Sequence, residues 1–108
     1  MSQSHGQSLM AYFTSRFKIK GIYFLDEPET ALSPKSQVKL LNLLEDMCRS
    51  GHAQFVIASH SPILLACPGA QILSFDENPV KQINYEDTEH FRIYREFMTD
   101  PKKFLLQD

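Results

Sequence analysis

The sequence predicts an α/β fold with a parallel βαβ core, followed by a C-terminal β-hairpin and helices. The first observation is a pair of short apolar runs, Ile22–Leu25 and Phe55–Ala58, whose residue types are typical of strands covered on both faces. The second is a stretch of helical periodicity, roughly fifteen residues long, that separates them. Strands joined by such a helix lie parallel in one sheet, with a right-handed crossover.

Composition limits the possible classes of protein. The chain has 108 residues, which fits one domain. With 43% hydrophobic and 22% charged residues, it is not a disordered chain, a coiled coil or a collagen-like repeat. The net charge of −2 gives no indication of a nucleic-acid surface. Cys48 and Cys67 form neither a zinc motif nor a disulfide framework, and no run is long enough to span a membrane. We expect two buried, reduced thiols in a cytoplasmic protein.

Local signals predict two helices in the first part of the chain. Apolar residues at three- and four-residue steps predict a helix from Leu9 to about Phe17. Ser33 followed by Pro34 is a typical start for the crossover helix, because a hydroxyl caps it and proline fits its first position. Gly51 is its stop signal. The predicted apolar stripe consists of Val38, Leu41, Leu44 and Cys48, with Leu40 and Met47 beside it.

The second part of the chain predicts a hairpin and a helix. After Pro62 we expect a short helical turn. Ala70–Phe75 and Val80–Tyr85 are predicted as antiparallel strands around a turn at Glu77–Pro79. A helix is predicted from Asp87 to Met98, and a last helical turn after Asp100-Pro101. The side chains expected to face the core are Ile72, Leu73 and Phe75 of the hairpin, and Phe91, Tyr94, Phe97 and Met98 of the helix.

An acidic pair, Asp26-Glu27, ends the first predicted strand. The carboxyl edge of an open α/β sheet is where ligands bind. A hydrophobic strand that ends in two acids is a Walker B pattern, in which Asp26 would hold Mg²⁺, an ion that prefers oxygen ligands. Glu27 would orient or deprotonate the water that attacks a γ-phosphate. The alternative is an acidic cap between a strand and a loop.

A histidine, His60, follows the second predicted strand and therefore belongs to the same sheet edge. It could donate a hydrogen bond to a γ-phosphate oxygen or to the attacking water. The alternative is a histidine that caps the next turn. Because both strands of one βαβ unit end in chemically useful side chains, we favour the functional interpretation.

A serine- and glycine-containing segment, Ser4–Ser8, precedes the first predicted helix. Free N–H groups at a helix N-terminus can bind an anion. Taken alone, the segment is more typical of a frayed chain end.

Taken in order, the segments SHGQ, IYFLDEPETALS and FVIASHSP resemble the C-terminal half of an ABC-type ATPase domain. The resemblance identifies Ser4, Gly6 and Gln7 with the signature loop, although His5 replaces a glycine. Gly21–Glu27 resembles Walker B with its catalytic glutamate, which implies that Asp26 binds the metal. Thr30–Ser33 resembles the D-loop, and His60 resembles the switch histidine. The fold implied is a partial P-loop NTPase fold.

The SHSP and DEPE segments are more similar to SMC/RecF-like and OLD-like predicted ATPases than to transporter subunits. Those families act in DNA repair, chromosome upkeep or phage defence. The resemblance therefore implies ATP and Mg²⁺ as ligands, a homo-oligomer, and DNA as a partner through a larger complex.

The sequence contains no GxxxxGK[ST] motif, because none of its glycines is followed by Lys-Ser or Lys-Thr. The resemblance implies that residues 1–108 are the C-terminal half of a nucleotide-binding domain, whose partner is the missing N-terminal half or a full-length ATPase subunit. We expect the isolated chain to bind ATP weakly and to be inactive. We also expect it to expose an apolar sheet surface or edge and to self-associate.

Two hypotheses about function remain open. The first is a fragment of an ATP-hydrolysing enzyme, with catalytic groups in place and a signature loop that completes a partner's site. The second is a non-catalytic interaction or dimerisation module that keeps the fold without ATP turnover. A helicase of the DEAD type fits poorly, because the residues after the first strand read DEPE.

Overall fold

The computed structural model describes residues 11–76 and 78–105. The chain divides into two compact units, Met1–Pro68 and Gly69–Asp108, each of which is described by itself. None of the helices in the described part is long and apolar enough to cross a membrane.

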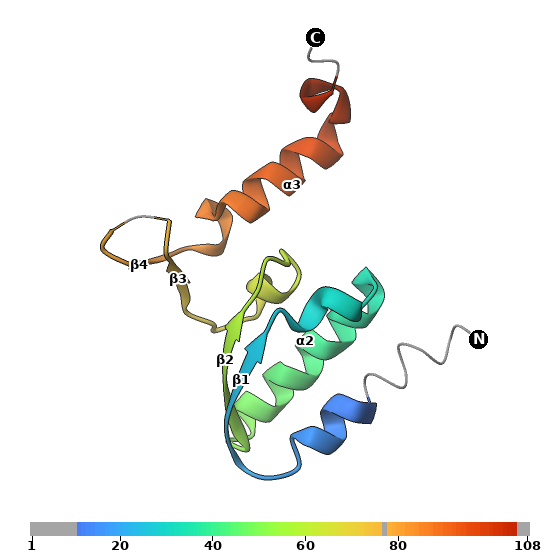
Figure 1. Cartoon of the computed structure of the whole chain (residues 1–108), viewed down its shortest axis with the longest axis vertical. Helices are drawn as coiled ribbons and strands as arrows, with labels where there is room; N and C mark the ends of the chain where they lie inside the picture. Colours follow the sequence, from blue (N-terminus) through green and yellow to red (C-terminus); the bar gives the residue numbers. More distant parts are fainter. Residues whose placement is uncertain (1–10, 77, 106–108) are drawn as a thin grey trace, which may run out of the picture. The chain divides into compact units, whose positions relative to one another are not determined.

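The first unit contains the predicted βαβ arrangement. Strands β1 (Gly21–Asp26) and β2 (Ala53–Ala58) pair in parallel, in a register that runs from Gly21 opposite Ala53 to Asp26 opposite Ala58. Helix α2 (Pro34–Arg49) connects them and lies along one face of the sheet (Figure 1). The parallel pairing and the crossover helix are confirmed. Residues 11–16 are helical, whereas the start of the predicted Leu9–Phe17 helix lies outside the described residues.

Helix α2 begins and ends where its sequence signals predict. The Ser33 hydroxyl accepts a hydrogen bond from the Ser36 N–H at 3.2 Å, and Pro34 occupies the first turn. After the helix, Gly51 adopts φ 79°, a left-handed conformation that glycine takes without steric cost.

The buried face of α2 differs from the predicted stripe. Its buried residues are Ser36, Leu40 and Leu44, whereas Val38 and Cys48 are exposed. Val38 lies two residues from Leu40 and therefore roughly opposite it on a helix of about 3.6 residues per turn. The expectation of two buried thiols is wrong for Cys48, and Cys67 is only half-buried.

The core of the first unit is small and partly aromatic. Its buried members are Phe17, Leu32, Leu40, Leu44 and Leu64. The Phe17 ring contacts the rings of Tyr23 and Phe55, with 4.9 Å between centroids in each pair. These contacts bring the chain before β1 against the inner face of the sheet.

The outer face of the sheet carries apolar side chains that nothing in the described residues buries. Ile22 and Phe24 of β1 and Val56 of β2 are exposed, Phe24 to 76%. Their neighbours along the strands, such as Leu25 and Ile57, pack against the core. The expectation that both faces would be covered is wrong for these residues, and the expected apolar surface is confirmed.

The second unit contains a short hairpin and a helix. Strands β3 (Ile72–Ser74) and β4 (Lys81–Ile83) pair antiparallel, with Leu73 opposite Gln82. The hairpin is confirmed, but both strands are shorter than predicted. At the end of β4, the chain from Tyr85 to Asp87 forms the 3-10 turn η3 instead of continuing the strand. Helix α3 (Glu89–Thr99) is followed by the 3-10 turn η4 (Pro101–Phe104), which confirms the predicted last helical turn.

Thr88 sets the start of α3 and explains why the helix begins later than predicted. Its hydroxyl accepts from the Phe91 N–H at 3.1 Å and donates to the Tyr85 carbonyl at 2.8 Å. Thr88 therefore joins the turn η3 to the helix as an N-cap.

The predicted core of the second unit is largely wrong. The side chains expected to be buried but found exposed are Leu73, Phe75, Tyr94, Phe97 and Met98. Helix α3 has no buried residue, and its aromatic rings pair with near neighbours in sequence, Tyr85 with Phe91 and Phe97 with Phe104. A short hairpin and one helix offer too little surface to bury these faces.

Candidate functional site

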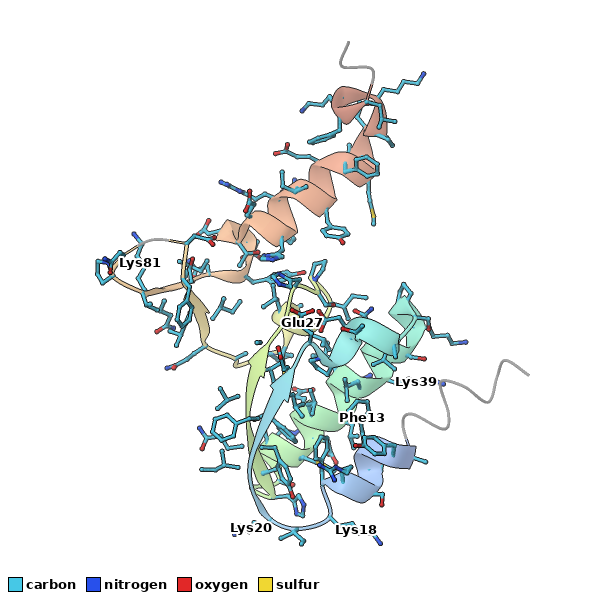
Figure 2. The ribbon with its side chains drawn as sticks, in the orientation of Figure 1. Phe13, Lys18, Lys20, Glu27, Lys39 and Lys81 are labelled. Atoms are coloured by element: carbon cyan, nitrogen blue, oxygen red, sulfur yellow. The ribbon has the colours of Figure 1, made fainter. Side chains whose placement is uncertain are left out.

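The carboxyl ends of β1 and β2 form one edge of the sheet, where three predicted site residues meet. Asp26, the last residue of β1, pairs with Ala58, the last residue of β2. The Glu27 N–H donates to the Ala58 carbonyl at 2.7 Å and so continues the strand pairing by one step. Figure 2 shows Glu27 at this end of the two strands. His60 follows β2 at the same edge.

Glu27 has a left-handed backbone, with φ 49° and ψ 57°. It is the only residue other than glycine with positive φ among the described residues. Its carbonyl accepts hydrogen bonds from the Thr30 N–H at 3.1 Å and from the Thr30 hydroxyl at 2.9 Å, which starts the 3-10 turn η1 (Pro28–Ala31). Such a conformation costs roughly 1–3 kcal/mol for a residue with a Cβ, and such residues cluster at functional sites.

The side chains of Glu27 and His60 face each other. Glu27 Oε2 lies 3.6 Å from His60 Nε2, and the two side chains are 49% and 72% exposed. A pair this exposed adds little to the stability of the fold. It is open to solvent, so a ligand can reach both groups.

Asp26, the residue before Glu27 in the chain, is exposed. Mg²⁺ prefers oxygen ligands and keeps several of its waters, so one carboxylate together with phosphate oxygens suffices to bind it. No group of three or more His, Cys, Asp or Glu side chains within residues 11–76 and 78–105 could hold a metal ion.

Glu29 is a residue of this edge to which sequence reasoning gave no role. Its Oε1 accepts from the Ser59 hydroxyl at 2.9 Å, and its Oε2 accepts from the His60 N–H at 3.1 Å. The half-buried carboxylate thus ties the turn after β1 to the turn after β2. Its only signal in the sequence is its place as the third acid of DEPE.

These hydrogen bonds belong to a closed ring, which we call the loop ring. It consists of Glu29, Ser59, Ser61, Gln37 and Leu32. The Ser61 N–H donates to Ser59 Oγ at 3.0 Å, and the Ser61 hydroxyl donates to Gln37 Oε1. Gln37 Nε2 donates to the Leu32 carbonyl at 3.1 Å, and the Leu32 N–H donates to the Glu29 carbonyl at 2.9 Å, which closes the ring. The ring joins both turns to α2.

Ser61 also supplies the cap that was considered for His60. Its Oγ accepts from the N–H groups of Ile63 at 3.1 Å and Leu64 at 3.2 Å, just before the 3-10 turn η2 (Leu64–Ala66). Ser61 is only 5% exposed, so these partners satisfy a hydroxyl that water hardly reaches.

The remaining predicted site residues are divided between two places. Thr30–Ser33 lies at the same edge, where Thr30 binds the Glu27 carbonyl and Ser33 caps α2. Ser4, Gly6 and Gln7 lie outside the described residues.

Comparison with known proteins identifies the first unit. The family described as "AAA domain, putative AbiEii toxin, Type IV TA system" matches residues 8–66, which include β1, α2 and β2. A search of curated proteins finds no match. Domains of this P-loop NTPase type use nucleotide and Mg²⁺ in general. Since the match covers more than half of the chain, the protein belongs to this AAA-domain family and carries an ATPase-like domain.

Proposed function

We propose that the edge formed by Asp26, Glu27 and His60 is the metal- and water-handling part of an ATP-hydrolysing site. The observation that carries the proposal is the 3.6 Å approach of Glu27 Oε2 to His60 Nε2 at the carboxyl ends of two parallel strands. That is the edge of an α/β sheet where ligands bind. The left-handed backbone of Glu27 and the family match are further support.

Each of the three side chains has a distinct role in this proposal. Asp26 binds Mg²⁺, which when present neutralises charge on the phosphate oxygens. Glu27 accepts a hydrogen bond or a proton from the attacking water. His60 donates a hydrogen bond to a γ-phosphate oxygen as charge develops there.

The finer assignment to the ABC-type branch is part of the same proposal. In it, Gly21–Glu27 serves as Walker B, Thr30–Ser33 as D-loop and His60 as switch histidine. Ser4, Gly6 and Gln7 form the signature loop that completes the site of a partner subunit. Residues 1–108 then work with a polypeptide that supplies the phosphate-binding loop, in a homo-oligomer that reaches DNA through a larger complex.

Single-turnover hydrolysis of ATP tests the proposal. The chain is assayed alone and after it is joined to a polypeptide that supplies the phosphate-binding loop, which gives the joined enzyme. In the joined enzyme, Glu27→Gln should lower the rate by roughly 10²–10⁴, the usual contribution of a general base, while ATP still binds. Asp26→Asn should raise the Mg²⁺ concentration needed for activity. His60→Ala should lower turnover with little change in binding.

Glu45→Gln is the matched control for these variants. Glu45 is a carboxylate on α2 whose partner is Arg49, with 3.4 Å between Oε2 and Nη1. Its removal should leave hydrolysis unchanged. Equal single-turnover rates for wild type and Glu27→Gln would mean that Glu27 is only a strand cap.

The second candidate function is a non-catalytic interaction module, which the exposed apolar sheet face favours. Ile22, Phe24 and Val56 offer an exposed apolar surface of the kind that binds another protein chain. Under this alternative, substitutions at Asp26 and Glu27 leave association unchanged, whereas Phe24→Lys abolishes it.

A further inference from the structure

We propose that Glu29 is a positioning residue, whose carboxylate holds the Ser59–His60 turn so that the His60 ring faces Glu27. This inference rests on the proposed function, because it concerns how one of the proposed catalytic groups is placed. The Glu29 carboxylate accepts hydrogen bonds from Ser59 and His60. It acts through the backbone of His60, to which it is bound at 3.1 Å.

The geometry of the contact is that of a clamp on two successive residues. One oxygen of Glu29 accepts from the side chain of Ser59 and the other from the backbone N–H of His60. Bonds to a charged acceptor are about twice as strong as neutral ones, and two parallel bonds also fix direction. The clamp therefore sets both the position and the orientation of the chain from which the His60 side chain extends.

The backbone of Glu27 is held by contacts other than the Glu29 clamp. Glu27 is fixed by its bond to the Ala58 carbonyl and by the two bonds from Thr30 to its own carbonyl. None of these involves the Glu29 side chain. Loss of the Glu29 carboxylate should therefore loosen the Ser59–His60 turn, whereas the backbone contacts of Glu27 remain.

The clamp needs a carboxylate of this length. The His60 N–H can only donate and so requires an acceptor oxygen, and Ser59 Oγ already accepts from the Ser61 N–H while it donates to Glu29. An ionised carboxylate offers two, whereas the amide of glutamine offers one oxygen and a donor group. Glu29→Gln therefore removes one acceptor without changing shape. Ser59→Ala removes only the contact between the Ser59 hydroxyl and Glu29. It keeps the hydrogen bond from the His60 N–H to Glu29, so its effect should be weaker.

The direct test is a nuclear magnetic resonance measurement on the full chain at one pH. Glu27→Gln removes a charge 3.6 Å from His60 Nε2 and should shift the His60 ring resonances. In a Glu29→Gln background most of that change should be lost, because the ring no longer faces position 27. In a Glu45→Gln background, the matched control, the change should persist in full.

Hydrogen exchange gives a second readout that does not depend on activity. Loss of a hydrogen bond to a charged acceptor should lower the protection of the His60 amide by about ten- to a hundredfold in Glu29→Gln, against no change in Glu45→Gln. If Glu29→Gln fails to fold, Ser59→Ala serves in its place. It should give a smaller loss of the His60 resonance change and of the His60 amide protection.

Hydrolysis separates this inference from the proposed function. In the joined enzyme, Glu29→Gln should lower kcat roughly ten- to a hundredfold at nearly unchanged KM, as expected for a misplaced group. If Glu27→Gln hydrolyses ATP as fast as wild type, the proposed function fails, and the resonance experiment still decides the role of Glu29. If the His60 ring responds equally to Glu27→Gln with and without Glu29, the inference is overturned, whatever the hydrolysis rates.

Discussion

Glu27 combines an unfavourable backbone conformation with a side chain aimed at His60. Glu27→Gly and Glu27→Ala both remove the side chain, but only alanine keeps the Cβ that the left-handed region disfavours by roughly 1–2 kcal/mol. Glycine loses more entropy on folding, which offsets part of this advantage. We therefore expect Glu27→Gly to be more stable than Glu27→Ala by a net amount of about 1 kcal/mol. Urea denaturation of both variants measures the difference. If Glu27→Ala is the more stable, the left-handed conformation does not persist in solution.

Cys67 should react slowly with alkylating agents in the folded chain. Burial raises the pKa of the Cys67 thiol, and the nearby Cys48 and Glu45 raise it further. The reactive thiolate is therefore scarcer in the folded than in the unfolded chain at pH 8–9, about the ordinary pKa of a thiol. Labelling with iodoacetamide, followed by mass spectrometry with and without urea, measures the ratio of rates. Because folding holds this proton more tightly, stability should also fall as pH rises through the raised pKa.

At the residue scale, the sequence predicts some of the candidate site. Asp26, Glu27 and His60 follow apolar strands, and the ends of parallel strands meet at one edge. Glu29 and Gln37 could not be found in this way. Their hydrogen bonds depend on which turns lie side by side, and no local pattern in the sequence encodes that contact.

At the scale of single elements, the caps of the helices can be tested one by one. Ser33→Ala removes the acceptor for the Ser36 N–H at the start of α2 and should cost about 1 kcal/mol of unfolding free energy. Ser50→Ala is the matched control at the other end of α2, where an exposed hydroxyl donates to the Met47 carbonyl at 3.2 Å. Its cost should stay within about 0.5 kcal/mol, as for most surface changes. Equal costs, read from denaturation midpoints, would contradict the capping role of Ser33.

The elements differ in how well they could be predicted. β1, α2 and β2 were found because apolar runs, a capping serine and a stop glycine act locally. The sequence does not predict which side of α2 is buried. Both Val38 and Leu40 are apolar, and only tertiary packing selects between them. The start of α3 was missed by two residues because Thr88, rather than an earlier acid, supplies its cap.

At the scale of the whole molecule, the small core makes the first unit sensitive to a single cavity. Leu40 is the largest fully buried side chain among the described residues. Leu40→Ala should cost about 2–5 kcal/mol, the usual range for a buried leucine. Domains of ordinary stability have only about 5–15 kcal/mol in total. Val38→Ala, on the exposed side of the same helix, should cost far less, and thermal unfolding of both variants measures the contrast.

The exposed sheet face should make the chain self-associate. Phe24 is 76% exposed beside Ile22 and Val56, and burial of such side chains against a second copy removes apolar surface from water. Sedimentation velocity at tens of micromolar should therefore detect oligomers that Phe24→Lys dissociates. Phe75→Lys is the matched control, because Phe75 is 79% exposed in the second unit. A wild-type chain that sediments as a monomer would contradict this expectation.

The loop ring also bears on how substitutions in this chain combine. In a connected set of hydrogen bonds, each bond is strengthened by the others. The first substitution that removes a bond should therefore lower the free energy of unfolding more than a later one does. The effects of Ser61→Ala and Gln37→Ala should therefore fall short of additivity when combined. In a lineage, the loss of one member would relax selection on the rest together. The residues of the loop ring, which lie in the turns and in α2, would then be conserved or replaced together.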